Sequence, residues 1–183
     1  MSWDADIFNW FHGLTGWSIF TDSIGVFLAK YLAYILVAAA LVFIFKQKGA
    51  KTRMSAFIRL ALSALIARGI IAELAYFAYF RIRPFTTFGF TPLVSAAGSS
   101  FPSGHVVLLF SLGLAIWTID RRFGSWFLAL SFVNGLARIF AGVHYPTDIL
   151  GGIAVALLGW AIAERLLKNP EIKGASVDNP ANL

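Results

Sequence analysis

Long apolar stretches separated by short polar segments set the pattern of this chain. They lie at about residues 23–45, 57–80, 103–119, 124–142 and 146–167. Roughly 20 apolar residues in a helix cross the hydrocarbon core of a bilayer, and a helix satisfies its own backbone hydrogen bonds there. The pattern therefore predicts an all-α fold, a polytopic membrane helix bundle with five transmembrane helices.

The first polar segment, residues 3–14, has its own periodicity. Aromatic and aliphatic side chains recur every three or four positions, opposite Asp4, Asp6, Asn9 and His12. This spacing is typical of a helix with one apolar face. Because the segment is too short and too polar to span a bilayer, we expect an amphipathic helix in the membrane interface. His12 is expected on its polar face, outside any catalytic role.

Two other segments lack helical periodicity. Residues 81–101 contain prolines, glycines and several Ser and Thr, which predicts a loop. Residues 169–183 contain two prolines and few apolar side chains, which predicts a disordered cytoplasmic tail. The remaining residues, 1–168, are predicted to form a single integral-membrane domain.

Composition agrees with a membrane protein. Of the 183 residues, 58% are hydrophobic and 13% are charged, whereas soluble domains average roughly 25% charged residues. The net charge of +6 does not indicate nucleic acid, because the basic residues lie in the connections between apolar stretches and not on one face. Cysteine is absent, which excludes disulfides and a thiol nucleophile.

The basic connections also predict an orientation. Residues 46–53, the turn at 121–122 and the tail after residue 167 fall on one side of a five-span bundle. Lysine and arginine are enriched in cytoplasmic loops. We therefore expect the C-terminus in the cytoplasm. The N-terminus, the loop at 81–101 and the turn at 143–147 are expected on the extracytoplasmic side.

Scarce ionisable residues concentrate in three stretches at that extracytoplasmic end, at 81–84, 101–105 and 138–148. Two of the three histidines of the chain fall inside them. Ionisable residues at membrane depth are costly and usually mark a functional site. The three stretches therefore predict one polar site.

Four residues of these stretches suit the binding of an anion. Ser103 and Gly104 follow a proline at a predicted helix start, where free N–H groups and the helix dipole attract oxyanions. Arg83 and Arg138 supply planar, bidentate donors that match phosphate oxygens. We predict that these residues bind a phosphoryl group.

The histidines supply candidate chemistry. His144 and Asp148 are four residues apart, so the carboxylate can accept a hydrogen bond from one imidazole nitrogen and leave the other free to attack. His105 can then protonate a leaving oxygen. This division of work suits displacement at phosphorus and predicts a bell-shaped pH profile.

Two other interpretations of these residues stay open. Asp148 can be an acidic residue that caps the first turn of the last span. Alternatively, His105, His144 and Asp148 can form a metal site with two histidines and one carboxylate. The neighbouring arginines would repel a cation, so we expect no metal and no cofactor.

Three charges lie deeper in the predicted spans. Lys30 and Glu73 fall at similar depth, and we predict that they form a structural ion pair because unpaired charges in hydrocarbon are costly. Arg68 needs a polar partner, for which Asn134 is a candidate.

The three polar stretches resemble the signature of the membrane-bound type-2 phosphatidic acid phosphatase superfamily: Lys-x6-Arg-Pro, Pro-Ser-Gly-His and Ser-Arg-x5-His-x3-Asp. The resemblance implies that His144 is a nucleophile that forms a phosphohistidine, with Asp148 as its orienting partner and His105 as general acid. It also implies that no metal is needed. The phosphoryl group would be bound by Arg83, Ser103, Gly104 and Arg138.

Two positions depart from this signature, because Tyr76 replaces its lysine and Ala137 its serine. Bacterial undecaprenyl-diphosphate phosphatases of the bacitracin-resistance type also lack that lysine, and they are similar to this chain at 7–14, 22–27 and 83–85. That branch tends to have aspartate where Gly104 stands here. Arg81 and Tyr76 are further candidate phosphate contacts, and Arg81 is a candidate replacement for the lysine.

The resemblance implies a function in lipid metabolism. We expect a hydrolase of a membrane lipid phosphate at the outer face of a bacterial inner membrane, with undecaprenyl diphosphate as the first candidate substrate. Phosphatidylglycerophosphate, phosphatidic acid and lipid A phosphate are alternatives. A non-catalytic binder or transporter of lipid phosphates is the alternative from another class.

Overall fold

The computed structural model describes residues 3–168, and these residues form helices and connecting turns without any strand. The predicted disordered tail lies outside the described residues. The helical segments are α1 (Trp3–His12), α2 (Ile19–Val26), η1 (Phe27–Tyr31), α3 (Leu32–Phe45), α4 (Ala50–Ala64), η2 (Leu65–Ile71), α5 (Ala72–Ala78), α6 (Pro84–Phe88), α7 (Gly104–Ile119), α8 (Arg121–Phe140) and α9 (Pro146–Lys168).

Two of the long helices contain a π-helical segment. Segment η1 joins α2 to α3 in one helix over Ile19–Phe45, and η2 joins α4 to α5 in another over Ala50–Ala78. These two helices, with α8 and α9, are long and apolar enough to cross a membrane, whereas α7 is shorter. The all-helical prediction is therefore confirmed. Of the five predicted spans, four are long and apolar enough to cross a membrane, and the fifth corresponds to the shorter apolar helix α7.

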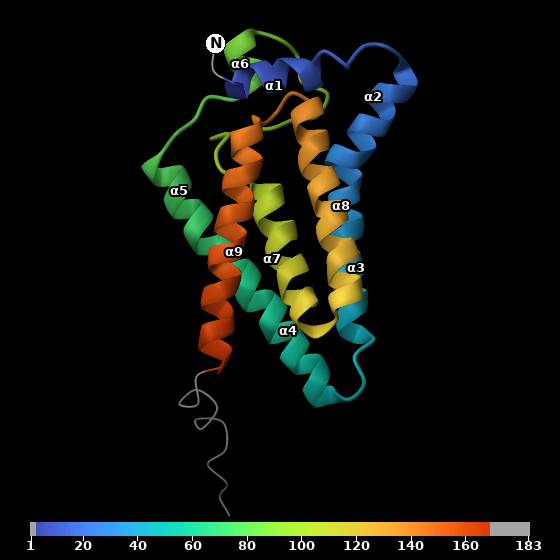
Figure 1. Ribbon diagram of the computed structural model, residues 1–183, viewed down its shortest axis with the longest axis vertical. Helices are drawn as coiled ribbons and strands as arrows, with labels where there is room; N and C mark the ends of the chain where they lie inside the picture. Colours follow the sequence, from blue (N-terminus) through green and yellow to red (C-terminus); the bar gives the residue numbers. More distant parts are fainter. Residues whose placement is uncertain (1–2, 169–183) are drawn as a thin grey trace, which may run out of the picture.

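Helix α7 lies at the centre of the bundle, between α4, α8 and α9 (Figure 1). It is apolar all round, which is typical of a helix without a solvent face. Glycines allow its close approach to α8: a Cβ at Gly113 would lie 2.7 Å from Leu128, and one at Gly124 would lie 2.3 Å from the backbone of Trp117. Small residues at such contacts let membrane helices pack closely. The first turn of α7 is thus held in the interior, where it can contribute to a site.

Helix α1 lies across one end of the bundle (Figure 1). Its Phe8 is fully buried and contacts the rings of Phe90 and Tyr145. His12 also faces the bundle, because it stacks on Phe90 and its Nδ1 lies 3.1 Å from the Phe140 carbonyl oxygen. The predicted polar-face position of His12 is therefore wrong, since an aromatic neighbour and a backbone carbonyl offer it partners inside.

The loop at 81–101 is less irregular than its composition predicts. It contains the short helix α6, which begins with Pro84, a residue whose fixed φ suits the first helical position. The helix ends at Gly89 in the left-handed conformation, with φ of 72°. The prediction of a loop without any helix is thus corrected.

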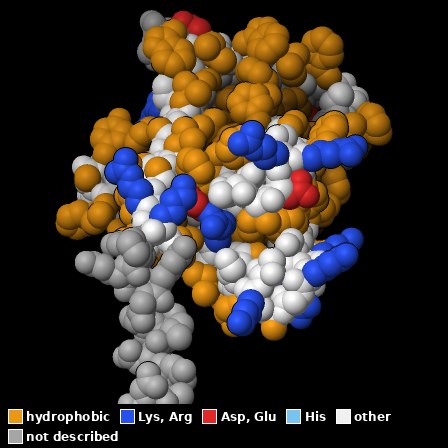
Figure 2. Space-filling model, turned by 60° about the horizontal axis from the view of Figure 1, so that its bottom comes forward, with side chains coloured by type: hydrophobic (Ala, Val, Ile, Leu, Met, Phe, Trp, Pro, Cys, Tyr) orange, Lys and Arg blue, Asp and Glu red, His pale blue; other side chains and the backbone are white. Residues whose placement is uncertain are grey.

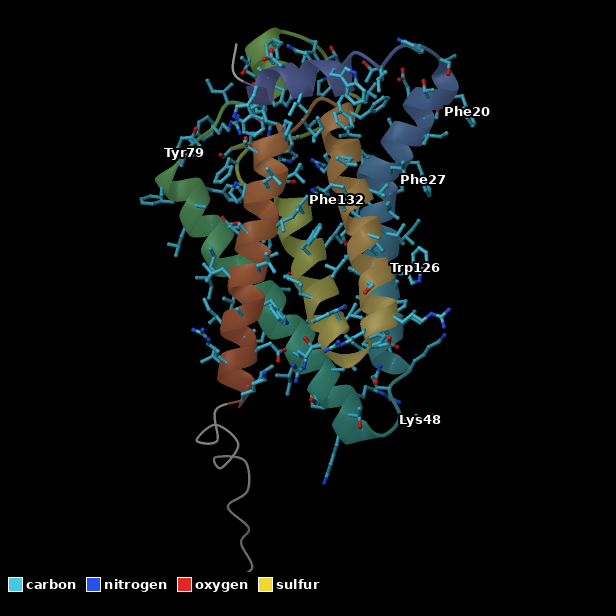
Figure 3. The ribbon with its side chains drawn as sticks, in the orientation of Figure 1. Phe20, Phe27, Lys48, Tyr79, Trp126 and Phe132 are labelled. Atoms are coloured by element: carbon cyan, nitrogen blue, oxygen red, sulfur yellow. The ribbon has the colours of Figure 1, made fainter. Side chains whose placement is uncertain are left out.

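The outer surface of the bundle separates apolar from basic side chains. Phe20, Phe27 and Trp126 project from its side (Figure 3) and are exposed. Lys and Arg side chains gather at the end away from α1, where Lys48 lies (Figures 2 and 3). Exposed aromatic side chains along the flanks suit contact with lipid.

Candidate active site

The three predicted polar stretches meet in one cavity of about 590 Å³. It lies near the end of the bundle covered by α1, at the first turn of α7. Its polar lining includes three arginines, two histidines, a tyrosine, a carboxylate and two serines: Arg68, Arg83, Arg138, His105, His144, Tyr76, Glu73, Ser95 and Ser99. The convergence of distant chain segments, expected from the scarcity of ionisable residues, is thus observed.

His144 lies in the turn between α8 and α9 and is buried, with 2% of its surface exposed. Its Nδ1 faces Asp148 Oδ2 at 3.5 Å, and its Nε2 faces Arg83 Nη1 at 3.4 Å. Arginine can only donate, so this contact favours Nε2 as the acceptor and places the proton on Nδ1, next to the carboxylate. This is the tautomer that leaves a lone pair on Nε2.

The surroundings also keep His144 neutral. Burial lowers the pKa of His144 from 6.5 to about 4, and the positive charge of Arg138 acts in the same direction, while Asp148 opposes both. A neutral imidazole at neutral pH is the form that can act as a nucleophile.

Asp148 is fully buried and its two oxygens have several donors. Oδ2 accepts hydrogen bonds from the Ser100 hydroxyl and, at 2.7 Å, from the backbone N–H of Tyr145. Oδ1 accepts from Arg81 Nη1 at 2.6 Å. The carboxylate therefore faces His144 and its neighbours, which favours the orienting role over a simple helix cap.

These partners also argue against the metal interpretation. Both oxygens of Asp148 already accept hydrogen bonds from N–H and O–H donors, one of them the cationic Arg81, which would repel a metal ion. Within residues 3–168, no group of three His, Cys, Asp or Glu side chains could hold a metal ion. His105 and His144 instead share the cavity with arginines.

Arg81 does not line the cavity, contrary to its predicted phosphate contact. Besides Asp148, it binds Asp4 of α1 through Nη2, and its guanidinium lies over the ring of Tyr145 at 4.2 Å. Although burial opposes it, the hydrogen bond to Asp4 together with Asp148 raises the pKa of Arg81. Two carboxylates compensate this charge, so Arg81 supports Asp148 and is not available to substrate.

Asp4 extends this network to the N-terminal helix. It is buried, and its Oδ1 accepts the backbone N–H of Thr147 at 3.0 Å while Oδ2 accepts the Thr147 hydroxyl at 2.7 Å. A chain of contacts therefore runs from α1 through Arg81 and Asp148 to His144. Ser100 and Asp4 were not predicted as site residues. Asp4 is an acidic residue within an amphipathic pattern, and that pattern alone indicates a solvated face.

Arg83 lines the cavity, but its five N–H groups have partners. Nε donates to the Gly98 carbonyl at 3.1 Å, and Nη2 donates to the carbonyls of Ala97 and Ser99, each at 2.9 Å. Nη1 donates to the Val143 carbonyl at 2.9 Å and faces His144 Nε2. Burial lowers the pKa of Arg83 without removing its charge. This arginine fixes the loop at 97–99 against His144.

Arg138 and Ser103 carry polar atoms without partners. Arg138 on α8 is 4% exposed; its Nη1 donates to the Ala29 carbonyl at 3.3 Å, and its Nε has no hydrogen-bond partner in the described chain. The buried Ser103 hydroxyl also has none there. A buried unsatisfied polar group costs about 1–3 kcal/mol. Arg138 lines the cavity, so its free Nε suits a bound anion, whereas Ser103 lies beside the lining residue Gly104 and is not itself part of the lining.

The first turn of α7 carries the other predicted residues. His105 is exposed to the cavity, beside Gly104. The backbone N–H of Ser103 donates to the Asp148 carbonyl at 3.0 Å, so this N–H is not free for an oxyanion as predicted. The Tyr76 hydroxyl donates to the Pro102 carbonyl at 2.9 Å and lies at the cavity wall.

The predicted ion pair between Lys30 and Glu73 does not form. Glu73 pairs with Arg68 instead, and Lys30 lies over the ring of Tyr31 at 5.3 Å. The π-helical turn η2 explains the difference, because its wider i→i+5 register places position 73 over position 68. Asn134, the predicted partner of Arg68, donates to the carbonyl of Leu28 at 2.6 Å.

The chain is similar in sequence to several known phosphatases. Residues 56–170 match the PAP2 superfamily. The chain is 32% identical over 154 residues to undecaprenyl-diphosphatase BcrC of Bacillus subtilis, across 84% of this chain and 78% of that protein. It is 29% identical over 140 residues to a lipid A 1-phosphatase of Rhizobium etli, across 62% of this chain and 60% of that protein.

The fold is also that of a solved structure. The crystal structure of Aquifex aeolicus LpxE matches with a TM-score of 0.73 at 18% identity, covering 90% of this chain and 96% of that one. The family match at 56–170 includes all three stretches that build the cavity. This multi-pass membrane protein therefore belongs to the PAP2 superfamily and is a hydrolase.

Proposed function

We propose that the protein hydrolyses the terminal phosphate of a lipid diphosphate, undecaprenyl diphosphate first, through a phosphohistidine on His144. One observation carries the proposal: the neutral Nε2 of His144 faces a cavity whose polar wall is built from arginines. Simple binding of an anion needs no oriented nucleophile, which argues against a non-catalytic binder or transporter.

In the first step, Nε2 of His144 attacks the terminal phosphorus. An N–P bond forms and the bond from phosphorus to the bridging oxygen breaks, so the lipid monophosphate leaves. His105 donates a proton to the leaving oxygen. Asp148 stabilises the positive charge that develops on the imidazole through Nδ1–H. Arg138 and the Ser103 hydroxyl, whose atoms lack partners, supply donors to the phosphoryl oxygens.

In the second step, water hydrolyses the phosphohistidine. His105 accepts a proton from the water as its oxygen bonds to phosphorus, and the N–P bond breaks. Inorganic phosphate is released, and His144 returns to its neutral form. His105 thus acts first as acid and then as base, while His144 carries the phosphoryl group, and this requires both imidazoles to reach one phosphorus.

The cavity has a second wall that suits a lipid. Ala33, Tyr34 and Val37 of α3 line it together with Leu108 of α7. These apolar side chains continue the polar lining toward the flank of the bundle. A headgroup can therefore enter beside His144 while its hydrocarbon tail stays in the bilayer.

The proposal includes the placement of this domain, residues 1–168, in a bacterial inner membrane. Five spans, with α7 as the short central one, place the cavity and α1 on the extracytoplasmic side and the C-terminus in the cytoplasm. The basic end of the bundle supports this orientation, because Lys and Arg face the cytoplasm in most membrane proteins (Figure 2). Helix α1 then lies in the outer interface.

Lipid A phosphate is the second candidate substrate, because one relative is a lipid A 1-phosphatase. Phosphatidylglycerophosphate and phosphatidic acid are the remaining candidate substrates. A comparison of kcat/KM for these four lipids in detergent micelles would rank them. We expect undecaprenyl diphosphate to have the highest value, and a higher value for another lipid would replace it as the substrate.

Trapping the intermediate tests the mechanism. Purified protein mixed with radiolabelled lipid diphosphate and quenched in alkali should carry an acid-labile label on His144. Activity should persist in EDTA. His144→Ala should lose at least about a thousandfold in kcat, as removal of a catalytic nucleophile does in other hydrolases. Activity that survives in His144→Ala would reject the assigned nucleophile.

A further inference from the structure

Arg68, Tyr76 and Gly104 form one packed unit at the edge of the cavity. A Cβ at Gly104 would lie 2.9 Å from the Tyr76 hydroxyl and 3.1 Å from Arg68 Nε. The guanidinium of Arg68 also lies over the ring of Tyr76, 5.5 Å from its centroid. Tyr76 and Gly104 are two of the positions at which the chain departs from the patterns it resembles. The structure shows that both departures border the same arginine.

The arginines of the cavity differ in their free donors. Arg83 has a partner for each N–H group, and most of these are backbone carbonyls that cannot move away independently. Arg68 donates to one side chain in the described chain, that of Glu73, and more than a third of its own side chain is exposed. Arg138, the third arginine of the lining, is only 4% exposed, so Arg68 is the one best able to turn toward a ligand.

Arg68 lies on the side of the cavity where the proposed leaving group would be. Nε of Arg68 abuts Gly104, the residue before His105, and His105 is the proposed proton donor to the leaving oxygen. His144, which takes the terminal phosphate, lies across the cavity with Arg83 and Asp148 around it. A charge on the leaving group would therefore lie next to Arg68.

We propose that Arg68 binds the phosphate that stays on the lipid, in place of the lysine replaced by Tyr76, and that it selects diphosphates over monophosphates. This inference rests on the proposed function. When the bridging P–O bond of a diphosphate breaks, negative charge grows on the lipid monophosphate, and a guanidinium can stabilise it with two parallel hydrogen bonds. A monophosphate substrate leaves as an alcohol and has no such group.

Glu73 complements this role. It pairs with Arg68 across the π-helical turn and is itself exposed to the cavity. Phosphate and carboxylate would compete for the same guanidinium, so binding of a diphosphate would exchange one partner for another. Gly104 leaves the space that the guanidinium and the tyrosine ring occupy.

Arg68→Gln tests the proposal, because it removes the charge and keeps much of the side-chain length. A charged hydrogen bond contributes about 1.5–3 kcal/mol, so kcat/KM for undecaprenyl diphosphate should fall roughly 10- to 150-fold. The value for phosphatidic acid, a monophosphate, should change less than about threefold, because it makes no contact with Arg68. Equal losses on both substrates would overturn the proposal. Arg122→Gln, on the exposed surface of α8, is the matched control.

Tyr76→Lys in the Arg68→Gln background tests whether a lysine at position 76 can take over the role of Arg68. A lysine at this position should restore at least about a tenth of the wild-type value for the diphosphate, since it returns a cation to the same edge of the cavity. No recovery in a folded double variant would show that position 76 and Arg68 do not share a ligand.

A readout without catalysis separates this inference from the proposed function. Inorganic pyrophosphate should raise the unfolding temperature of the wild type in detergent, and it should do so much less in Arg68→Gln, while orthophosphate should affect both alike. If the wild type hydrolyses no lipid phosphate, the proposed function fails and this binding experiment still decides the role of Arg68. An equal response of both proteins to pyrophosphate would end the inference.

Discussion

The two sides of the cavity are built in opposite ways. Around His144, the contacts through Asp148, Arg81 and Asp4 leave few N–H or O–H groups without a partner. Beside His105, Arg68 has one side-chain partner, Glu73, and more than a third of its side chain is exposed. The first side holds His144, the proposed nucleophile, in one orientation, while the second leaves Arg68 free to adapt to the proposed leaving group. Rigidity is concentrated where the N–P bond would form, because a small misplacement of the nucleophile is costly there.

The strongest test of this contrast is at Asp148. Asp148→Asn should lower kcat by about 10³- to 10⁴-fold, because an amide can present N–H to His144 and favour the wrong tautomer. Phosphate release in detergent measures it. KM should change little, since Asp148 does not face substrate. A loss below tenfold would show that the tautomer of His144 is set elsewhere, for example by Arg83.

The next test is at Asp4, at the other end of the chain of contacts that leads to His144. Asp4→Asn leaves Arg81 with one carboxylate instead of two and should lower kcat about 10- to 100-fold through disorder of Asp148. It should also lower the unfolding temperature, because breaking a buried ion pair costs about 3–5 kcal/mol. Asp6→Asn, an exposed aspartate on the same helix, is the control and should change neither property. Unchanged kcat in Asp4→Asn would limit this network to stability.

The pH profile sharpens the comparison further. With the pKa of His144 lowered to about 4, the nucleophile stays neutral well below the ordinary histidine value of 6.5. The acid limb that belongs to His144 should therefore lie near pH 4. Stability should also fall as the pH drops from 6.5 to 4, because the unfolded chain then binds a proton at this residue and the folded chain does not. A kcat/KM profile that stays flat from pH 5 to 9 would count against two histidines sharing the work.

The smallest effect is expected on the open side. Glu73→Gln frees Arg68 from its carboxylate and should lower KM for the diphosphate by about two- to threefold, the range of an exposed ion pair. The KM for phosphatidic acid should stay the same as in the wild type. A rise in KM for the diphosphate would mean that Glu73 positions Arg68 for binding and does not compete with phosphate.

Much of the nucleophile side could be predicted from sequence, because its residues are close together in the chain. His144 and Asp148 are four residues apart across the start of α9, and that spacing made a contact between them predictable. The helices were predictable for a similar reason, since apolar length is a local property. The bounds of the second long helix differ, because Ala50–Ala64 begins in a basic segment with little hydropathy.

The residues that sequence reasoning missed depend on distant contacts. Asp4 meets Thr147 across a sequence separation of 143 residues, and nothing in an amphipathic pattern indicates such a partner. The pair of Arg68 and Glu73 was missed because a π-helical turn changes the register of a helix without a clear sequence signal. The assignment of Arg81 to phosphate failed for the same reason: two carboxylates from opposite ends of the chain already compensate its charge.

The contact between Asp4 and Thr147 has a consequence for biogenesis. The first helix and the last span must both be in place before the carboxylate beside His144 acquires its complete set of partners. A chain that ends before the last span, α9, lacks Asp148 and leaves His144 without its carboxylate partner. Completion of the last span and docking of the N-terminal helix are thus two separate requirements for the full set of contacts around Asp148.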